Sequence, residues 1–321
     1  MKNQRKIIGI MKLGKINIAA ILSMLLLLSF SKVSAQTEPM YSQYMFNMLN
    51  INPAYAGSRS VPSLTSLFRK QWLGIRGAPQ TSSISLDMPM KQDKIGIGIQ
   101  LLDDRLGVER TTGAQLNYAY RVPVSDNGVL AMGIRVGLLN YRANYSQLFT
   151  IRPNDPVYYQ NVSGFLPAAG AGIYYMTDNF YAGASVPSLL QTKLNSDQQA
   201  DVKSKVSNLH FFATMGAVLK ISDDLNLKPS VLMKTVSGAP IQFDFNSNLW
   251  LQDRIAIGLS YRTGDAIIGI VEYQINDKLR FGYDYDHTIS KLNPYNLGTH
   301  EVMIRYEFSK DKTNIQSTRY F

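Results

Sequence analysis

The sequence predicts an all-β protein: a transmembrane antiparallel outer-membrane β-barrel of about 14 strands with a short N-terminal periplasmic segment. Three observations predict this class. The chain starts with an export signal, no later stretch is long and apolar enough for a membrane helix, and apolar and polar residues alternate with period two along most of its length. A chain that spans lipid without helices must do so as a closed sheet, because lipid offers no partner to unpaired backbone groups.

The export signal occupies the first part of the chain. Five basic residues and no acid precede an almost wholly apolar run over residues 16–30, and Val33-Ser34-Ala35 follows with the small residues that a signal peptidase reads. The apolar run is shorter than the roughly 20 residues that a spanning helix needs, so cleavage is favoured over an uncleaved anchor helix. We therefore expect a signal peptide over 1–35, cleaved between Ala35 and Gln36.

The basic net charge is only weak support for nucleic-acid binding, because most of it lies in the export signal. The formal charge of the whole chain is +10, but six Lys and Arg residues and no acid lie in residues 1–35, so the remaining chain carries +4. Cysteine is absent, which excludes disulfides and a lipid-modified N-terminal cysteine. The modest charged fraction of 17% fits a barrel, in which only every second residue of a strand meets lipid.

The period-two alternation is clearest late in the chain. In residues 255–262, 279–286 and 302–308, large apolar or aromatic residues alternate with small or polar ones, as on a strand whose two faces meet different surroundings. The polar faces of residues 111–122 and 241–251 are rich in Asn, Gln, Asp and Arg. A membrane barrel with a polar lumen is therefore favoured over a soluble β-sandwich or a lipocalin-like barrel.

We expect the barrel to span residues 63–309, with a C-terminal tail over 310–321. The expected strands lie near 63–73, 79–88, 95–104, 111–122, 129–143, 165–176, 180–187, 208–221, 225–236, 241–251, 254–262, 265–275, 278–288 and 299–309. Tight turns, expected on the periplasmic side, lie at 125–128, 177–179, 222–224, 237–240, 264–265 and 276–277. Longer links, expected to be extracellular, lie near 144–164, 188–207 and 289–298.

The segment over 36–62, before the first expected strand, does not alternate. It contains Tyr41-Ser-Gln-Tyr-Met-Phe-Asn47 and Ile51-Asn-Pro-Ala-Tyr-Ala-Gly-Ser-Arg59, and Leu67-Phe-Arg-Lys-Gln-Trp-Leu-Gly-Ile-Arg-Gly-Ala-Pro79 follows. These motifs strongly resemble the PorP/SprF family of type IX secretion system membrane proteins of Bacteroidota. The resemblance covers the whole chain after the signal peptide, with its weight in residues 40–105, although Met48 stands where many members have Pro.

The resemblance implies an outer-membrane barrel that serves type IX secretion. Some relatives are linked to protease secretion together with a peptidoglycan-binding periplasmic lipoprotein. Others are linked to the export and surface attachment of large adhesins used in gliding motility, through the adhesin's C-terminal domain. The implied partners are membrane lipid, other type IX secretion components, and either this lipoprotein or this adhesin domain; nothing implies nucleic acid.

The segment and the first strand supply our candidate partner-docking residues. In this segment, Asn-Pro and Ala-Gly pairs that interrupt regular structure lie among Tyr, Phe, Met and Ile side chains that offer apolar contact area. We expect a structured periplasmic collar or plug that packs against the barrel mouth or docks a partner; a stabilising N-terminal cap without a partner is an equal alternative. A lipid-interface anchor is the favoured role for Trp72 alone. The candidates, all expected at one end of the barrel, are Tyr41, Tyr44, Phe46, Asn52, Pro53, Tyr55, Gly57, Arg69, Lys70 and Trp72.

Residues that would support catalysis are few. The three His residues, His210, His287 and His300, are far apart in sequence and each adjoins an expected strand, so nothing local supports a Ser–His lipase. Asp284 and Asp286 share a face at a spacing able to bind calcium, but lining a lumen is the commoner reason for such residues. We expect no enzyme, metal or cofactor, and a general diffusion porin is the alternative function.

Overall fold

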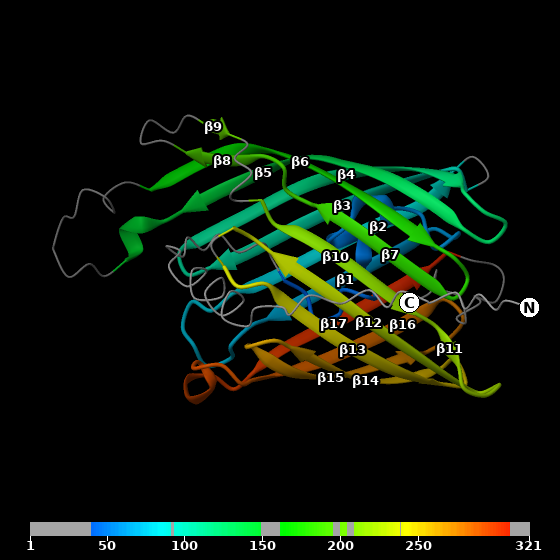
Figure 1. Cartoon of the computed structure of the whole chain (residues 1–321). Coiled ribbons are helices and arrows are strands. Elements are labelled where there is room, and N and C mark those ends of the chain that lie inside the picture. Colours follow the sequence, from blue (N-terminus) through cyan, green and yellow to red (C-terminus); the bar gives the residue numbers. More distant parts are fainter. Residues whose placement is uncertain are drawn as a thin grey trace, which may run out of the picture.

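The computed structural model describes residues 40–90, 93–148, 161–194, 200–203, 209–237 and 239–308 (Figure 1). They form a single cylinder of tilted antiparallel strands. In this part of the chain, no helix is long and apolar enough to cross a membrane. The expected signal peptide and C-terminal tail lie outside the described residues and remain predictions.

The strands are β1 (Ser63–Lys70), β2 (Gln80–Met90), β3 (Ile95–Leu106), β4 (Glu109–Pro123), β5 (Val129–Ala143), β6 (Val162–Met176), β7 (Phe180–Val186), β8 (Gln191–Leu194), β9 (Ala200–Lys203), β10 (Phe211–Ala217), β11 (Leu219–Lys220), β12 (Leu225–Thr235), β13 (Gln242–Leu251), β14 (Ile255–Arg262), β15 (Ala266–Gln274), β16 (Leu279–Thr288) and β17 (Thr299–Glu307). The short 3₁₀ helices are η1 (Met48–Asn50), η2 (Pro53–Tyr55), η3 (Tyr145–Gln147) and η6 (Asn293–Tyr295).

The sheet closes into a ring through two pairings. β1 pairs with β17, and β10 pairs with β12, so each wall strand has a neighbour on both sides. β11 continues the register of β10 against β12, and the interruption between them lies opposite Lys228 and Pro229, of which Pro229 has no N–H to donate. Counting β10 and β11 as one wall strand, and leaving out the separate β8–β9 hairpin, the barrel has the 14 strands predicted from the sequence.

The wall is apolar outside and polar inside. Along β14, Ile255, Ile257, Leu259 and Tyr261 are exposed, whereas the residues between them are buried and end with Arg262. β4 behaves in the same way, with exposed leucine and tyrosines alternating with buried Gln, Asn and Arg. This is the reverse of a soluble protein, and it confirms the prediction of a membrane barrel with a polar lumen.

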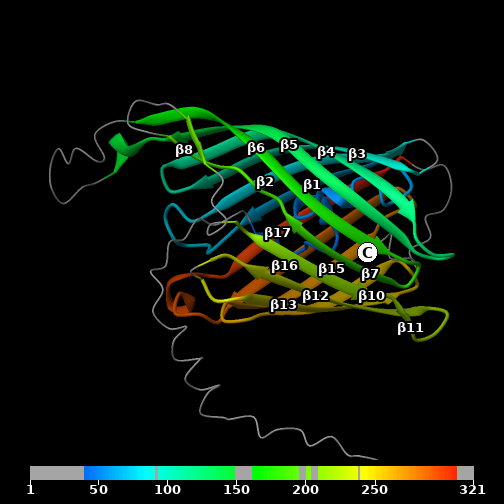
Figure 2. The ribbon, with the colours of Figure 1, turned by 45° about the horizontal axis from the view of Figure 1, so that its top comes forward.

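The two ends of the barrel differ. We call the end where β1 begins and β17 finishes the terminal end, and the opposite end the loop end. Residues 144–148, which include η3, the link 289–298 and the β8–β9 hairpin lie at the loop end, whereas β11 lies at the terminal end (Figure 2). Bacterial barrels of this kind have short periplasmic turns and longer extracellular loops, so the loop end corresponds to the cell exterior.

Two of the six expected periplasmic turns lie at the loop end instead. The turns at 125–128, 177–179, 222–224 and 276–277 lie at the terminal end, as predicted, but those at 237–240 and 264–265 connect β12 to β13 and β14 to β15. Strand direction alternates around the ring, so these two links must lie beside the long loops. The prediction was wrong there because it assigned sides by turn length.

An arginine in place of Leu259 tests the outward face. Leu259 lies in the middle of β14 with 63% of its surface exposed, so Leu259→Arg places a charge against lipid. We expect the free energy of unfolding in lipid vesicles, measured by urea titration, to fall by about 2–4 kcal/mol. The control Tyr295→Arg, on a loop-end residue that is 73% exposed, should change it little. Equal losses in the two variants would contradict the lipid-facing assignment.

Candidate functional site

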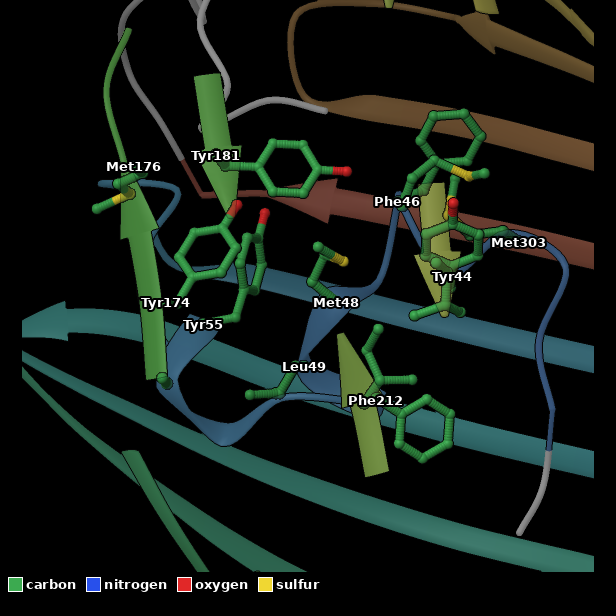
Figure 3. Close-up of a cluster of buried hydrophobic side chains, with 14 of the residues drawn as sticks. Tyr44, Phe46, Met48, Leu49, Tyr55, Tyr174, Met176, Tyr181, Phe212 and Met303 are labelled. Carbon is green, nitrogen blue, oxygen red and sulfur yellow. The ribbon is translucent and has the colours of Figure 1, made fainter. Parts of the chain in front are cut away.

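Residues Met40–Arg59 lie inside the barrel, and we call them the lumen plug. Every residue from Tyr41 to Arg59 is buried. The plug forms hydrogen bonds to β2, β3, β5, β6, β7, β12, β16 and β17, so wall strands surround it on all sides. Figure 3 shows its aromatic and methionine side chains packed among strands from different parts of the ring.

Local chemistry explains the shape of the plug. Asn52 precedes η2 and caps it, its side-chain Oδ1 accepting a hydrogen bond from the Ala54 N–H at 2.9 Å. Pro53 occupies the first helical position, where its missing N–H costs nothing. Gly57 then turns the chain with φ of +63°, and a Cβ there would collide with the backbone of Met88. The Asn-Pro and Ala-Gly pairs of the motif are therefore a cap and a tight turn.

The plug carries an apolar cluster that packs against the wall. Tyr55 meets Tyr174 edge to face at 5.5 Å between ring centroids, and Tyr174 stacks on Tyr181 at 5.6 Å (Figure 3). On the plug, Tyr44 reaches Ser230 with its hydroxyl at 3.3 Å.

Glycines in the wall let the plug backbone approach closely. A Cβ at Gly133 of β5 would overlap the backbone of Ala54, and one at Gly96 of β3 would overlap the carbonyl of Ala56. Both glycines face the lumen, where other wall residues have side chains. The sequence motif Gly96-Ile-Gly98 therefore marks a contact with the plug.

Wall side chains donate hydrogen bonds to carbonyl oxygens of the plug backbone. Arg135 donates to the carbonyl oxygens of Leu49 and Asn50, the latter at 3.1 Å, and Arg121 donates to that of Ala56. The hydroxyl of Ser185 donates to the carbonyl of Ile51 at 2.6 Å. These bonds remove the main cost of burying irregular backbone, which is unpaired polar groups.

A buried network toward the loop end, which we call the charge latch, holds the start of the plug. It consists of Ser42, Arg69, Arg262, Asp286 and Glu301. The Ser42 hydroxyl accepts from Arg69 at 2.7 Å and from Arg262 at 3.1 Å, and it donates to Asp286 at 2.8 Å. The Glu301 carboxylate accepts the backbone N–H groups of Ser42 at 3.0 Å and Gln43 at 2.8 Å.

The latch charges are paired with one another. Arg69 lies 2.9 Å from Asp286 and 3.0 Å from Glu301, and Arg262 lies 3.2 Å from Asp244. At the other end of the plug, Arg59 pairs with Glu307 at 3.1 Å. The plug is thus held by hydrogen bonds to buried charged groups near its start, by an ion pair at its end and by apolar packing between them.

The structure brings most of the candidate docking residues together, but it places them inside the barrel lumen. Tyr41, Tyr44, Phe46, Asn52, Pro53, Tyr55 and Gly57 are buried plug residues, and Arg69 is a buried latch residue. Lys70 and Trp72 lie apart from them, at the loop end, where β1 finishes. The Trp72 N–H donates to the Thr299 hydroxyl at 3.1 Å, and the Trp72 backbone is left-handed with φ of +47°.

Sequence reasoning missed the wall residues that hold the plug. Glu301, Arg262, Arg135 and Gly133 occupy inward positions of alternating strands, and the sequence pattern does not distinguish them from residues that merely line a lumen. Among the described residues, no group of three or more His, Asp or Glu side chains is arranged to hold a metal ion. His300 instead shares a 2.7 Å hydrogen bond with the Tyr283 hydroxyl.

Solved structures similar to this chain, at low similarity, include a porin, an outer membrane protein and a FadL homologue. A FadL homologue of Pseudomonas aeruginosa matches with 10% identity, 85% of this chain, 95% of that chain and a TM-score of 0.47. Omp33 of Acinetobacter baumannii matches with 9% identity, 78% and 98% coverage and a TM-score of 0.43. The KdgM porin matches with 8% identity, 77% and 99% coverage and a TM-score of 0.38. No curated protein matches by sequence.

The closed ring, its apolar exterior and its polar lumen define an outer-membrane β-barrel with an internal plug. The model of the type IX secretion system membrane protein PorP/SprF family matches residues 33–306. The chain belongs to this family, as the motifs at Tyr41–Arg59 and Leu67–Pro79 indicated.

Adding one methyl group at Gly133 tests the close approach of the plug. We expect Gly133→Ala to displace Ala54 and lower the free energy of unfolding by about 1–3 kcal/mol, as overpacking does. Hydrogen exchange of residues 41–59 should rise in the same variant. The matched control is Gly269→Ala, because nothing lies within 4 Å of a Cβ at that outward-facing position. If both variants behave like the unaltered protein, the plug does not contact β5 as described.

Removing one charge from the latch tests its role. Glu301→Gln leaves Arg69 with a single acidic partner and weakens the acceptor of two plug N–H groups, so we expect a loss of about 3–5 kcal/mol in the free energy of unfolding. We also expect the double variant Arg69→Met with Glu301→Leu to lose less free energy of unfolding than the summed losses of the single variants Arg69→Met and Glu301→Leu. The double variant removes both charges, whereas each single variant leaves the other buried charge without that partner. Asp223→Asn, in an exposed ion pair with Lys220, is the control and should leave stability unchanged. A loss in Glu301→Gln no larger than in this control would count against the latch.

Proposed function

We propose that this barrel is a plugged component of the type IX secretion machinery, and that it supports export or surface anchoring of secreted proteins and adhesins by docking partner proteins. The observation that supports the proposal is the lumen plug. Nineteen consecutive residues from Tyr41 to Arg59 are buried within the ring and hydrogen-bonded to it. A diffusion porin needs a water-filled lumen, so this arrangement favours docking over diffusion.

With the plug inside, the surfaces available to partners are the two ends of the barrel. The loop end offers an ordered face, because three of its links are joined by backbone hydrogen bonds: Leu73 N–H to the Gly298 carbonyl at 2.8 Å, Leu297 N–H to the Leu73 carbonyl at 2.7 Å, and Gly107 N–H to the Gly77 carbonyl at 2.8 Å. Two large apolar side chains, Tyr295 and Leu297, are 73% and 69% exposed there. We propose that this face, with Lys70 and Trp72 nearby, contacts a secreted adhesin through its C-terminal domain.

The terminal end is the candidate contact for a periplasmic partner such as a peptidoglycan-binding lipoprotein. Its links are short turns, and the plug ends there at Arg59, which pairs with Glu307. A partner at this end would bind the turns and the last plug residues rather than Tyr44 or Tyr55, which are enclosed by the wall. We further propose that the chain reaches the outer membrane after signal-peptide cleavage near Ala35.

Conductance and affinity isolation together test this function. In planar bilayers the purified barrel should show no large, steady, ion-permeable openings, whereas deletion of residues 40–58 should produce them if the rest of the barrel still folds. Heat-modifiable migration on gels reports whether the deleted form is folded. Large openings in the intact protein would overturn the plugged-scaffold proposal in favour of a porin.

Affinity isolation from native membranes, followed by mass spectrometry, identifies the partners. We expect the intact protein to recover other type IX secretion components, and the paired change Tyr295→Ser with Leu297→Ser to lose an extracellular adhesin selectively. The matched control is Val124→Ser, a 53% exposed residue at the terminal end. If the loop-end variant recovers the same proteins as the intact barrel, the assignment of the adhesin to this face is wrong.

A further inference from the structure

The lumen contains, toward the terminal end, two arginines that face each other. Arg280 on β16 and Arg305 on β17 are direct cross-strand partners, and each is 1% exposed. Such partners have Cβ atoms roughly 4.5–5.5 Å apart, and like charges placed there repel. A protein keeps two buried guanidinium groups this close only if something of opposite charge compensates them.

The surrounding acids compensate them only in part. Glu272 lies 3.3 Å from Arg280, and Glu307 is held at 3.1 Å by a third cation, Arg59. The described residues give Arg305 no ion pair within 4.0 Å; its Nε donates to the Thr65 hydroxyl at 3.2 Å and its Nη2 to the Met303 sulfur at 3.7 Å. A thioether is a weak acceptor, so the Arg305 charge is poorly compensated.

More positive charge lies nearby. The Lys228 ammonium is 4.7 Å from the centroid of the Trp250 ring, and the Arg280 guanidinium carbon is 4.9 Å from the same centroid. Two further acids, Asp253 and Asp87, accept hydrogen bonds from neutral donors. Asp253 accepts from Asn226 at 3.3 Å, and Asp87 accepts from the Gly57 N–H at 3.0 Å and the Ser63 hydroxyl at 2.9 Å.

Several donors in this region are buried without an acceptor. Within the part of the chain that the structure describes, Nη2 of Arg280, Nη1 of Arg305 and Nε1 of Trp250 have no hydrogen-bond acceptor, and Nη1 of Arg280 faces Glu272 Oε1 at 3.3 Å without hydrogen-bond geometry. Guanidinium groups present forked donors that match the oxygens of phosphate and similar anions. Unpaired guanidinium N–H donors on two adjacent arginines are therefore a recognition pattern for an oxyanion.

We propose that the arginine pair Arg280–Arg305, with Trp250 and Lys228 beside it, binds a small inorganic oxyanion such as phosphate inside the lumen. The enclosure limits the ligand's size, because Arg280 and Arg305 are 1% exposed and Trp250 and Lys228 are fully buried. The anion bridges β12, β13, β16 and β17, which lie across the ring from the β3–β6 wall against which η2 packs.

Anion content and thermal stability test the site on the full-length barrel in detergent. After dialysis into chloride buffer without phosphate or sulfate, the protein is denatured and its released anions are measured by ion chromatography. Separately, the unfolding temperature is followed as inorganic phosphate replaces chloride at constant ionic strength. We expect either about one oxyanion per barrel or a saturable rise in unfolding temperature with phosphate.

The variants separate the site from general salt effects. Arg305→Gln should weaken phosphate binding about tenfold or more, because charged hydrogen bonds are lost, and Arg280→Gln should do the same. Arg76→Gln, an exposed loop-end arginine, is the control and should keep the response. The proposal is overturned if the intact protein retains no anion and does not respond to phosphate. It is also overturned if Arg305→Gln raises the unfolding temperature and leaves the phosphate response intact, which is the result expected from relieving repulsion alone.

Discussion

Lipid cannot hydrogen-bond a peptide group, so the sheet must close on itself, and in this chain the pairing of β10 with β12 closes it. Closure with 14 strands creates a second problem. A ring of about eight strands is filled by its own side chains, whereas a larger ring leaves space inside. The chain fills part of that space with the segment that precedes the first strand. Both the wall and the plug therefore follow from the need to close the sheet in lipid.

Placing irregular backbone inside the ring has consequences for the wall. Arg121, Arg135 and Ser185 donate to plug carbonyls, and Gly96 and Gly133 leave room for its backbone. These residues do not contribute to strand formation, since other residues would form the same strands. Each of them contacts the plug, so the wall is adapted to it. The lumen is therefore better understood as a polar core than as the lining of an open channel.

The sequence predicted the wall far better than the lumen. Alternation depends on neighbours two residues apart, and it located all 14 wall strands, including 255–262 and 279–286. The plug depends on distant partners: Ser42 and Glu301, which share a hydrogen bond, are 259 residues apart. Inward residues such as Arg135 resemble ordinary lumen lining, and aromatic residues such as Tyr44 fill cores as readily as interfaces. For this reason the segment's composition indicated contact area but not whether that area faces a partner or the wall.

The distribution of charge within the lumen bears on how the barrel takes part in secretion. Near the loop end, the latch cations Arg69 and Arg262 face carboxylates at ion-pair distance and also hold the plug through Ser42. Displacing the plug would break its hydrogen bonds to these charged groups, the Arg59–Glu307 ion pair and the hydrogen bonds to several plug carbonyls, at a net cost of about 0.5–3 kcal/mol each. A structure that must break many coupled contacts to open is poorly suited to conduct substrates continuously, but it gives its two ends a fixed geometry. A rigid outer-membrane platform that binds partners at those ends is the role that this energetic balance favours.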